Sequence, residues 1–549
     1  MSTEPDDHNP DSEPGQDPNA ELSPEEQAAE ILRALGAEDR LKELDTEHSD
    51  DSGEADYSDG KPSQATRLVA LARRQYRTVL GNDGKCYAGP LDGPRIALTL
   101  RGENGLRTRL ARAYFDDTQS AAGASAIADA MTVLEGQAVD TDPEPVALRI
   151  ARHDGGALVL DLGTPDARAV VIGPDGWEIV NEPPVLFRRT RLTSPLATPA
   201  RQGADGSDRL DRLRGLLNVS ESGFRLLVAW LVAALFPGIP HPILALSGEQ
   251  GTAKSTTGRT LVSLIDPSPA PLRTAPKDAR AWTVQAAASW TVMLDNVSSI
   301  PAWFSDTLCK AVTGDGMVER ALYTDDDVNV LSFQRVIGMT TIDAGALRGD
   351  LAERILMVEL DPIPPSARRT DDHVKADYES AAPAILGAIL DLTAQVLATL
   401  PTVTVTELPR LADFAKILAA IDQVQGWSTL ADFTALAQEI TEAVIEADRF
   451  ADAVRGLIHD KRNWTGTAAR LLELLPAPDG TAKTWPRTAR GVSGHLRRVA
   501  PALRKHGIGI DFVRSSDGSG ARLIRLRFGD DPIQPSDRHE PSEIPFDLP

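Results

Sequence analysis

The chain has 549 residues but little cysteine, few aromatic residues and no long apolar run. Its two cysteines, Cys86 and Cys309, exclude a disulfide scaffold and a cysteine-rich zinc site. The longest apolar run, residues 226–236, spans 11 residues, whereas a membrane-spanning helix needs about 20. The first residues lack the basic and apolar regions of a signal peptide. These absences predict a soluble cytoplasmic protein with no membrane partner.

Negative charge is concentrated at the two ends of the chain. Residues 1–60 contain 20 acidic and three basic side chains, and residues 529–549 contain six and one. Residues 61–528 are nearly neutral, although the formal net charge of the whole chain is −23. The acidic pI of 4.9 therefore does not exclude a nucleic-acid partner. We predict a mostly disordered acidic arm over 1–63 and a disordered acidic tail over 529–549.

A mixed α/β domain is predicted at 64–200. Helical patterning covers 67–79 and 121–134, and short strand patterns follow at 147–152, 157–162 and 169–172. No catalytic constellation is visible here, so a structural role is the default. A segment rich in Pro, Gly and Asp, 192–208, is predicted to be a linker.

The strongest motif is G-E-Q-G-T-A-K-S at 248–255, between an apolar strand pattern at 242–247 and a helical pattern at 255–265. This context is that of a P-loop, in which backbone N–H groups and a helix N-terminus surround phosphates. We expect Lys254 to reach the β- and γ-phosphates of ATP and Ser255 to bind Mg²⁺. The predicted ATP-binding residues are Gly248, Glu249, Gln250, Gly251, Thr252, Ala253, Lys254, Ser255 and Thr256.

Ala253 departs from the usual P-loop pattern, which has Gly directly before the Lys. We expect alanine to be tolerated there, because the start of a helix needs a right-handed backbone that alanine adopts. The alternative is a glycine-bearing turn from strand to helix that carries a solvent-exposed lysine.

A second acidic position follows at the end of the apolar strand pattern T-V-M-L-D-N, 291–296. Asp295 is predicted to hold the Mg²⁺ shell together with Ser255. Hydrolytic P-loop proteins of the additional-strand class usually place Glu or Asp next, to orient the attacking water, but this chain has Asn296. Asn can hydrogen-bond a water but cannot accept its proton, so ATP binding is better supported than rapid turnover.

Three further segments complete a resemblance: K-A-V-T-G-D-G-M-V-E-R-A-L-Y at 310–323, F-Q-R-V-I-G-M-T-T at 333–341 and R-G-D-L-A-E-R at 348–354. With the two motifs above, their order resembles the AAA+ core of superfamily 3 helicases. It is similar, more specifically, to the ATP-binding replication proteins of actinobacterial phages and integrated mobile elements. The resemblance spans about residues 147–528.

The resemblance implies roles for particular residues. Thr340 takes the sensor-1 position, where superfamily 3 usually has Asn. Lys310, Arg320 and Tyr323 fall in the segment that bears a DNA-contacting hairpin. Arg348 or Arg354 is implied as an arginine finger acting on a neighbouring subunit's ATP. For each of these the alternative is a surface ion pair.

The C-terminal part is predicted to hold a helical connector at 366–463 and a winged-helix DNA-binding domain at 464–528. Residues 485–527 contain ten basic and two acidic side chains, a local reversal of charge. A basic amphipathic helix is followed by two strand patterns joined by S-S-D-G-S-G, as in a helix followed by a wing. The alternative is a solvated basic face. The predicted DNA-binding residues here are Arg487, Arg490, Arg497, Arg498, Arg504 and Arg522.

The predicted fold is therefore α/β, with a P-loop AAA+ core at 208–365 between these N- and C-terminal domains. The leading functional prediction is an ATP-driven, helicase-like DNA replication protein that assembles into a ring, a hexamer by analogy. Asn296 and Thr340 leave open a slow or non-hydrolysing ATP-dependent DNA-binding initiator. A P-loop kinase or signalling ATPase is the third alternative, disfavoured by the winged-helix pattern.

Overall fold

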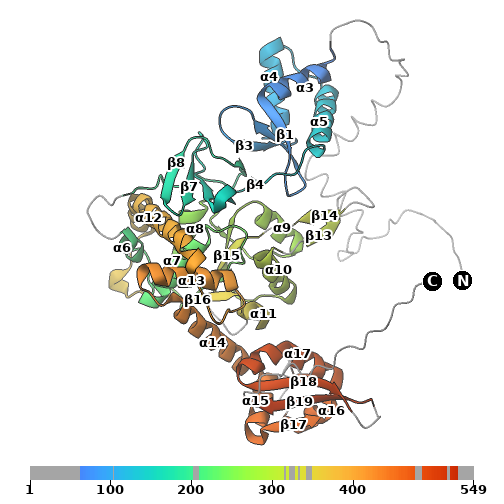
Figure 1. Cartoon of the computed structure of the whole chain (residues 1–549), viewed down its shortest axis with the longest axis vertical. Helices are drawn as coiled ribbons and strands as arrows, with labels where there is room; N and C mark the ends of the chain where they lie inside the picture. Colours follow the sequence, from blue (N-terminus) through green and yellow to red (C-terminus); the bar gives the residue numbers. More distant parts are fainter. Residues whose placement is uncertain are drawn as a thin grey trace, which may run out of the picture. The chain divides into compact units, whose positions relative to one another are not determined.

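The computed structural model describes residues 62–102, 104–201, 209–314, 317–320, 328–331, 334–341, 349–476, 485–515 and 520–529, and its elements carry the labels of Figure 1. All but the first residue of the predicted acidic tail, and all but the last two residues of the predicted acidic arm, lie outside these residues. So do Tyr323 and Arg348. Within the described part the chain is mixed α/β, as predicted.

The N-terminal part combines three helices with a five-stranded sheet of order β1-β2-β3-β9-β4. Helices α3 and α5 contact each other and strand β1. The sheet is mixed, because β3, β9 and β4 run parallel while β1, β2 and β3 are antiparallel neighbours. The bounds are α3 Gln64–Gln75, α4 Leu106–Thr118, α5 Ala124–Val139, β1 Tyr76–Leu80, β2 Cys86–Pro90, β3 Ile96–Thr99, β4 Val146–Ala147 and β9 Leu186–Arg188.

The prediction of a helix over 67–79 is wrong in its last turn. Helix α3 ends at Gln75, and Tyr76 begins strand β1, which pairs with β2. The aromatic Tyr76 and the β-branched Thr78 and Val79 favour a strand, and pairing with β2 decides between the two conformations.

A second, antiparallel sheet has the order β5-β6-β7-β8 and confirms the three strand patterns predicted between 147 and 172. Its strand β8 is tied to helix α12, Asp371–Thr399, because Trp177 Nε1 donates a 2.7 Å hydrogen bond to Asp391. The bounds are β5 Ile150–Arg152, η1 Asp154–Gly156, β6 Leu158–Asp161, β7 Ala169–Gly173 and β8 Gly176–Val180.

The described part of the predicted linker, up to residue 201, is not a free connection. The backbone N–H groups of Ser194, Leu196 and Ala200 donate to the carbonyls of Pro267, Leu162 and Pro383. Leu196 is also buried. Proline and glycine mark irregular backbone, and here that backbone is held against three separate elements.

The central sheet is parallel, with the order β11-β12-β15-β10-β16. Strand β15 therefore lies between β10 and β12. Its strands are β10 Ile243–Ser247, β11 Leu272–Arg273, β12 Thr291–Val297, β15 Val336–Thr341 and β16 Ile355–Glu359. The associated helices and hairpin strands are α6 Arg209–Arg214, α7 Glu221–Ala233, α8 Lys254–Ile265, α9 Ala279–Ala287, α10 Ala302–Thr313, β13 Met317–Arg320, β14 Val328–Leu331 and α11 Gly349–Ala352.

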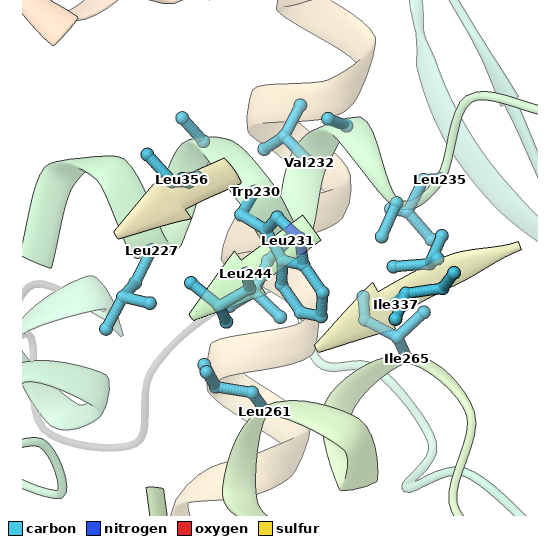
Figure 2. Close-up of a cluster of buried hydrophobic side chains, with 14 of the residues drawn as sticks. Leu227, Trp230, Leu231, Val232, Leu235, Leu244, Leu261, Ile265, Ile337 and Leu356 are labelled. Atoms are coloured by element: carbon cyan, nitrogen blue, oxygen red, sulfur yellow. The ribbon is translucent and has the colours of Figure 1, made fainter. Parts of the chain in front are cut away.

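The apolar run at 226–236 is a core element, as predicted. Figure 2 shows Leu227, Trp230 and Leu231 of α7 beside Leu244 of β10 and Leu261 of α8. All of these side chains are nearly fully buried, which is worth about 1.5–3 kcal/mol for each large apolar side chain. The same packing holds β10, and hence the turn that follows it, in place.

Helices follow the central sheet. They are η2 Pro365–Ala367, α12, η3 Leu400–Thr402, α13 Ala412–Gln425 and α14 Thr429–Ala447. Residues Asp371–Thr402 are long and apolar enough to cross a membrane by length and composition. However, 72% of that apolar window is buried within the protein, as in a core helix.

The C-terminal part has three helices around a three-stranded antiparallel sheet of order β17-β19-β18 (Figure 1). Its apolar core extends from Ile445 to Leu526, so it begins before the predicted boundary at 464. The bounds are α15 Arg449–Lys461, β17 Asn463–Gly466, α16 Ala468–Leu474, α17 Ala489–Lys505, β18 Ile508–Arg514 and β19 Arg522–Phe528.

Candidate nucleotide-binding site

The turn between β10 and α8 has the backbone of a phosphate-binding loop. Gly248 and Gly251 adopt φ values of 138° and 86°, which residues other than glycine rarely adopt. A Cβ at Gly248 would also lie 2.8 Å from the Leu360 carbonyl oxygen. The loop therefore needs glycine at position 248, and α8 begins directly after it at Lys254.

Ala253 corrects an expectation. It adopts φ 64° and ψ 30°, a left-handed conformation, and not the right-handed one expected at the start of a helix. The usual P-loop glycine avoids the clash that Cβ makes in this region, which costs roughly 1–2 kcal/mol. This chain keeps the loop conformation and tolerates the strained alanine.

Lys254 turns back onto its own loop. Its Nζ donates 2.7 Å hydrogen bonds to the carbonyl oxygens of Gly248 and Glu249. Both partners are neutral carbonyls, so no carboxylate neutralises the ammonium through these bonds. The charge lies at the loop, where phosphate oxygens can take the place of the carbonyls.

The second motif meets the first as predicted. Ser255 Oγ, in the first turn of α8, donates a 2.8 Å hydrogen bond to Asp295 Oδ1 at the end of β12. Thr340 Oγ1, from the neighbouring strand β15, donates a 2.6 Å bond to the same oxygen. Three elements far apart in sequence thus converge on one carboxylate.

Asn296 lies at an irregular point of β12. Its φ is 55°, and the pairing of β12 with β15 shifts register between Leu294 and Val297. Asn tolerates the left-handed region better than most residues. Its backbone N–H donates a 2.8 Å bond to Thr340 Oγ1, so Thr340 fixes the backbone of position 296 as well as the Asp295 side chain.

The residues present fit a magnesium nucleotide. Mg²⁺ prefers oxygen ligands, and the Ser255 and Asp295 oxygens lie 2.8 Å apart beside the loop. The amide-rich turn and the N-terminus of the 12-residue helix α8 favour phosphate. Ser255 and Asp295 are the residues that would hold the ion.

Arg354, one of the two candidate arginine fingers, makes contacts within its own chain. Its side chain is 9% exposed, and it pairs with Asp350 at 3.0 Å and donates to the Asp350 carbonyl. These contacts tie α11 to the start of β16, and a role of Arg354 as an arginine finger stays a prediction. The other candidate, Arg348, lies outside the described residues.

The segment before β15 forms an antiparallel hairpin, β13 with β14, where the resemblance implied one. Arg320 is the last residue of β13, and Lys310 is exposed in the last turn of α10. Their contact with DNA stays a prediction.

The arginines predicted to bind DNA in the C-terminal part fall into two groups. Arg504 donates to the Ile510 carbonyl at 2.9 Å, and the Arg497 guanidinium lies 4.5 Å from the centre of the Phe512 ring. These two contacts join α17 to β18. All six predicted arginines are exposed, these two included, and the other four are Arg487, Arg490, Arg498 and Arg522.

Arg368 was missed by sequence reasoning. Its guanidinium lies 3.8 Å from the position that a Cβ on Gly251 would occupy, so it is next to the phosphate loop. It is 114 residues from Lys254 and carries no motif, and the only signal was the pair of arginines at 368–369. Its charge adds to that of Lys254 at the same loop.

Two family models match the chain. The model for the actinomycete integrative conjugative element replication protein matches residues 210–443, which include the loop, Asp295 and Thr340. The model for the C-terminal domain of the same replication protein, RepA, matches residues 450–540. No curated protein matches the chain.

Several solved structures also resemble the chain, at low similarity. The apo structure of the NrS-1 C-terminal region is 11% identical, with 85% of this chain and 100% of that chain covered and a TM-score of 0.34. The JCV helicase structure is 12% identical, with 43% and 72% covered and a TM-score of 0.20.

Proposed function

The chain belongs to the replication-protein family of actinomycete integrative conjugative elements, and we propose that it is an ATP-dependent motor with a P-loop AAA+ core that moves on or remodels DNA as helicases do. The observation that carries this proposal is the convergence of Lys254, Ser255, Asp295 and Thr340 at one edge of the central sheet.

The strand order supports the AAA+ assignment. In P-loop ATPases of the additional-strand class, a further strand separates the P-loop strand from the strand that bears the magnesium aspartate. Here β15 lies between β10 and β12 and carries Thr340, which is hydrogen-bonded to Asp295. A polar side chain on the inserted strand can then sense the γ-phosphate or the attacking water.

In the proposed mechanism, each side chain has one task. Bound Mg²⁺ would neutralise phosphate charge, held by Ser255 and Asp295. Lys254, which now donates to two backbone carbonyls, would donate to phosphate oxygens when the nucleotide is bound. Thr340 keeps the Asp295 carboxylate oriented and holds the backbone of Asn296, whose side chain would position the water without accepting its proton.

DNA is the proposed partner, through two surfaces. One is the β13–β14 hairpin with Lys310, and the other is the C-terminal part, which we propose to be a winged helix. Its order α15, β17, α16, α17, β18, β19 places two helices and a basic third helix before a hairpin. Self-association into a ring, a hexamer by family analogy, would bring each loop next to a neighbouring subunit.

A second candidate function is an ATP switch that binds DNA when ATP is bound and turns over slowly. Asn296 favours it, because this position has no carboxylate to accept a proton from water. In that case ATP binding, and not hydrolysis, would control DNA binding.

The test is the steady-state ATPase rate of the full chain with and without single-stranded DNA, together with its native mass. The motor predicts DNA-stimulated turnover that Lys254→Ala abolishes, whereas Lys277→Ala, which removes an exposed lysine outside the loop, leaves it unchanged. ATP binding without turnover would support the switch. Normal hydrolysis by Lys254→Ala would show that the site is wrongly assigned.

A further inference from the structure

A cavity of about 850 Å³ lies in the N-terminal part, away from the phosphate loop. Its lining comes from the end of α3, the start of β1, the turn between β2 and β3, strand β3, helix α4 and the end of β9. The volume falls within the range of pockets that take small ligands, about 300–1,000 Å³. It can hold one or a few nucleotide units but not a duplex.

The lining is strongly basic. It includes five arginines and one carboxylate, that of Asp92. Three of the arginines belong to the short run R-R-T-R at 188–191, and the other two are Arg74 of α3 and Arg109 of α4. Between its two acidic ends the chain is nearly neutral, so this concentration of arginine favours the binding of an anion.

Side chains of the run at 188–191 are bonded to other segments of the protein. Arg189 forms an ion pair with the buried Asp161 at 2.7 Å, and Arg188 donates to the Ala287 carbonyl at 3.0 Å. Thr190 Oγ1 donates to the next carbonyl, that of Ala288, at 2.8 Å. These bonds hold the side chains of Arg188, Arg189 and Thr190 at the end of β9, so the site is preformed here.

The lining also includes two exposed arginines and a tyrosine. Arg74 and Arg109 are exposed on two helices, and Tyr76, at the start of β1, is half-buried and also packs against the apolar core of this part. Arginine with a tyrosine ring is the combination that binds single strands, because the guanidinium contacts phosphate and the ring stacks on a base. A purely inorganic anion would not need the ring.

The cavity is also connected to the nucleotide site. The carbonyl of Ala286, next to the Arg188 partner Ala287, accepts a 2.5 Å bond from Arg335. A ligand that draws Arg188 away from the end of α9 would therefore disturb the neighbouring contact between α9 and Arg335. Arg335 directly precedes β15, the strand that carries Thr340.

We propose that this cavity is a second nucleotide-phosphate site, and that its ligand is a short stretch of single-stranded DNA. The inference goes beyond the proposed function, which gives residues 64–200 no role, and it does not require ATP turnover. A free nucleotide has the same phosphate and base chemistry, so the test has one arm for each source.

The test uses photocrosslinking of the full chain carrying Lys254→Ala, which removes binding at the phosphate loop. One arm uses a single-stranded oligodeoxythymidylate with 5-iododeoxyuridine, and the other uses 8-azido-ATP. The crosslinked peptides are then mapped. We expect the oligonucleotide to label the peptide that contains Tyr76, and Arg74→Ala with Arg109→Ala to reduce this labelling about tenfold.

The matched control is Arg73→Ala with Arg107→Ala. These two exposed arginines lie on the same helices, α3 and α4, but outside the cavity lining. They should leave the labelling unchanged, and circular dichroism should show that both double variants are folded. Labelling of Tyr76 by 8-azido-ATP alone would replace DNA by a free nucleotide as the ligand. No labelling of the cavity in either arm, or equal loss in both double variants, would overturn the proposal.

Discussion

Thr340 and Asp295 are joined by a 2.6 Å hydrogen bond between neighbouring strands. The Thr340 hydroxyl donates to the carboxylate and accepts from the backbone N–H of Asn296, so both of these bonds are directed at the end of β12. A buried hydroxyl with two such partners holds both in one geometry. The inserted strand thereby fixes the position of the proposed magnesium ligand.

Thr340→Val keeps the shape of the side chain but removes both bonds. We expect ATP turnover to fall at least tenfold while the Kd for ATP changes little, because the loop contacts remain. The unsatisfied Asn296 N–H should also reduce the free energy of unfolding by about 1–3 kcal/mol. Single-turnover hydrolysis and fluorescent-nucleotide binding measure the two effects separately.

Thr340→Ser is the matched control, because it retains the hydroxyl and loses only a methyl group. It should recover most of the turnover. If the valine and serine variants turn over ATP equally, the hydroxyl does not orient the site.

Ala253→Gly should stabilise the protein. The left-handed backbone at position 253 is strained for alanine and easy for glycine. The gain is expected to be about 1 kcal/mol, offset in part by the greater entropy of glycine in the unfolded chain. Denaturant unfolding in the absence of nucleotide gives the change directly.

The control for this substitution is Ala128→Gly, at an exposed position inside helix α5. Its backbone is right-handed, so glycine should destabilise it by about 1 kcal/mol. Destabilisation by both substitutions would show that position 253 is not strained.

The phosphate loop could be predicted from sequence because its signals are local: an apolar strand, two glycines, Lys-Ser and a helix. Ala253 shows the limit of that reasoning. The residue type is compatible with a helix start, but closure of the loop onto α8 imposes a left-handed backbone. The hydrophobic periodicity of the sequence does not indicate which backbone conformation the closure of a loop requires.

Long-range contacts set the other limits. Tyr76 and the residues after it continue a helical pattern, but pairing with β2 draws them into a strand. Arg354 forms an ion pair with Asp350, and Asp350 also pairs with Arg410 from a distant segment. The Arg354–Asp350 pair joins residues four apart and is therefore local, whereas the pairing of β1 with β2 and the Asp350–Arg410 pair are not visible in one segment read alone.

His241 should make the protein sensitive to mild acid. It is fully buried between α7 and β10, and burial lowers its pKa to about 4 from an ordinary 6.5. Between these values the unfolded chain binds a proton that the folded chain does not, so stability falls as the pH falls. The loss from pH 7 to about pH 4 is expected to be about 3 kcal/mol.

His241→Gln keeps a donor for the Ala233 carbonyl, which the ring nitrogen contacts at 3.0 Å, but cannot titrate. We expect its stability to fall less than that of the original chain between pH 6.5 and pH 4.5, in urea unfolding at each pH. His459→Gln, at a side chain 73% exposed, should leave the profile unchanged. A profile that His241→Gln does not flatten would contradict the assignment.

The C-terminal arginines should separate into two classes by their response to salt. Arg490 and Arg498 are exposed on α17, where phosphate contacts would form. Arg490→Ala and Arg498→Ala should each weaken DNA binding and reduce the slope of log K against log salt concentration, by about 0.9 for each lost contact on a duplex. Anisotropy titrations of the full chain at several salt concentrations give both quantities, and thermal unfolding of these variants should be unchanged.

Arg504→Ala should behave in the opposite way, since its guanidinium caps the Ile510 carbonyl within the protein. Losing that bond leaves a carbonyl at the start of β18 without its donor, and the free energy of unfolding should fall by about 1–2 kcal/mol. At temperatures where the variant is folded, its salt slope should match that of the original chain. A reduced slope for Arg504→Ala with normal stability would place this arginine on the DNA instead, and would mean that α17 detaches from β18 when DNA binds.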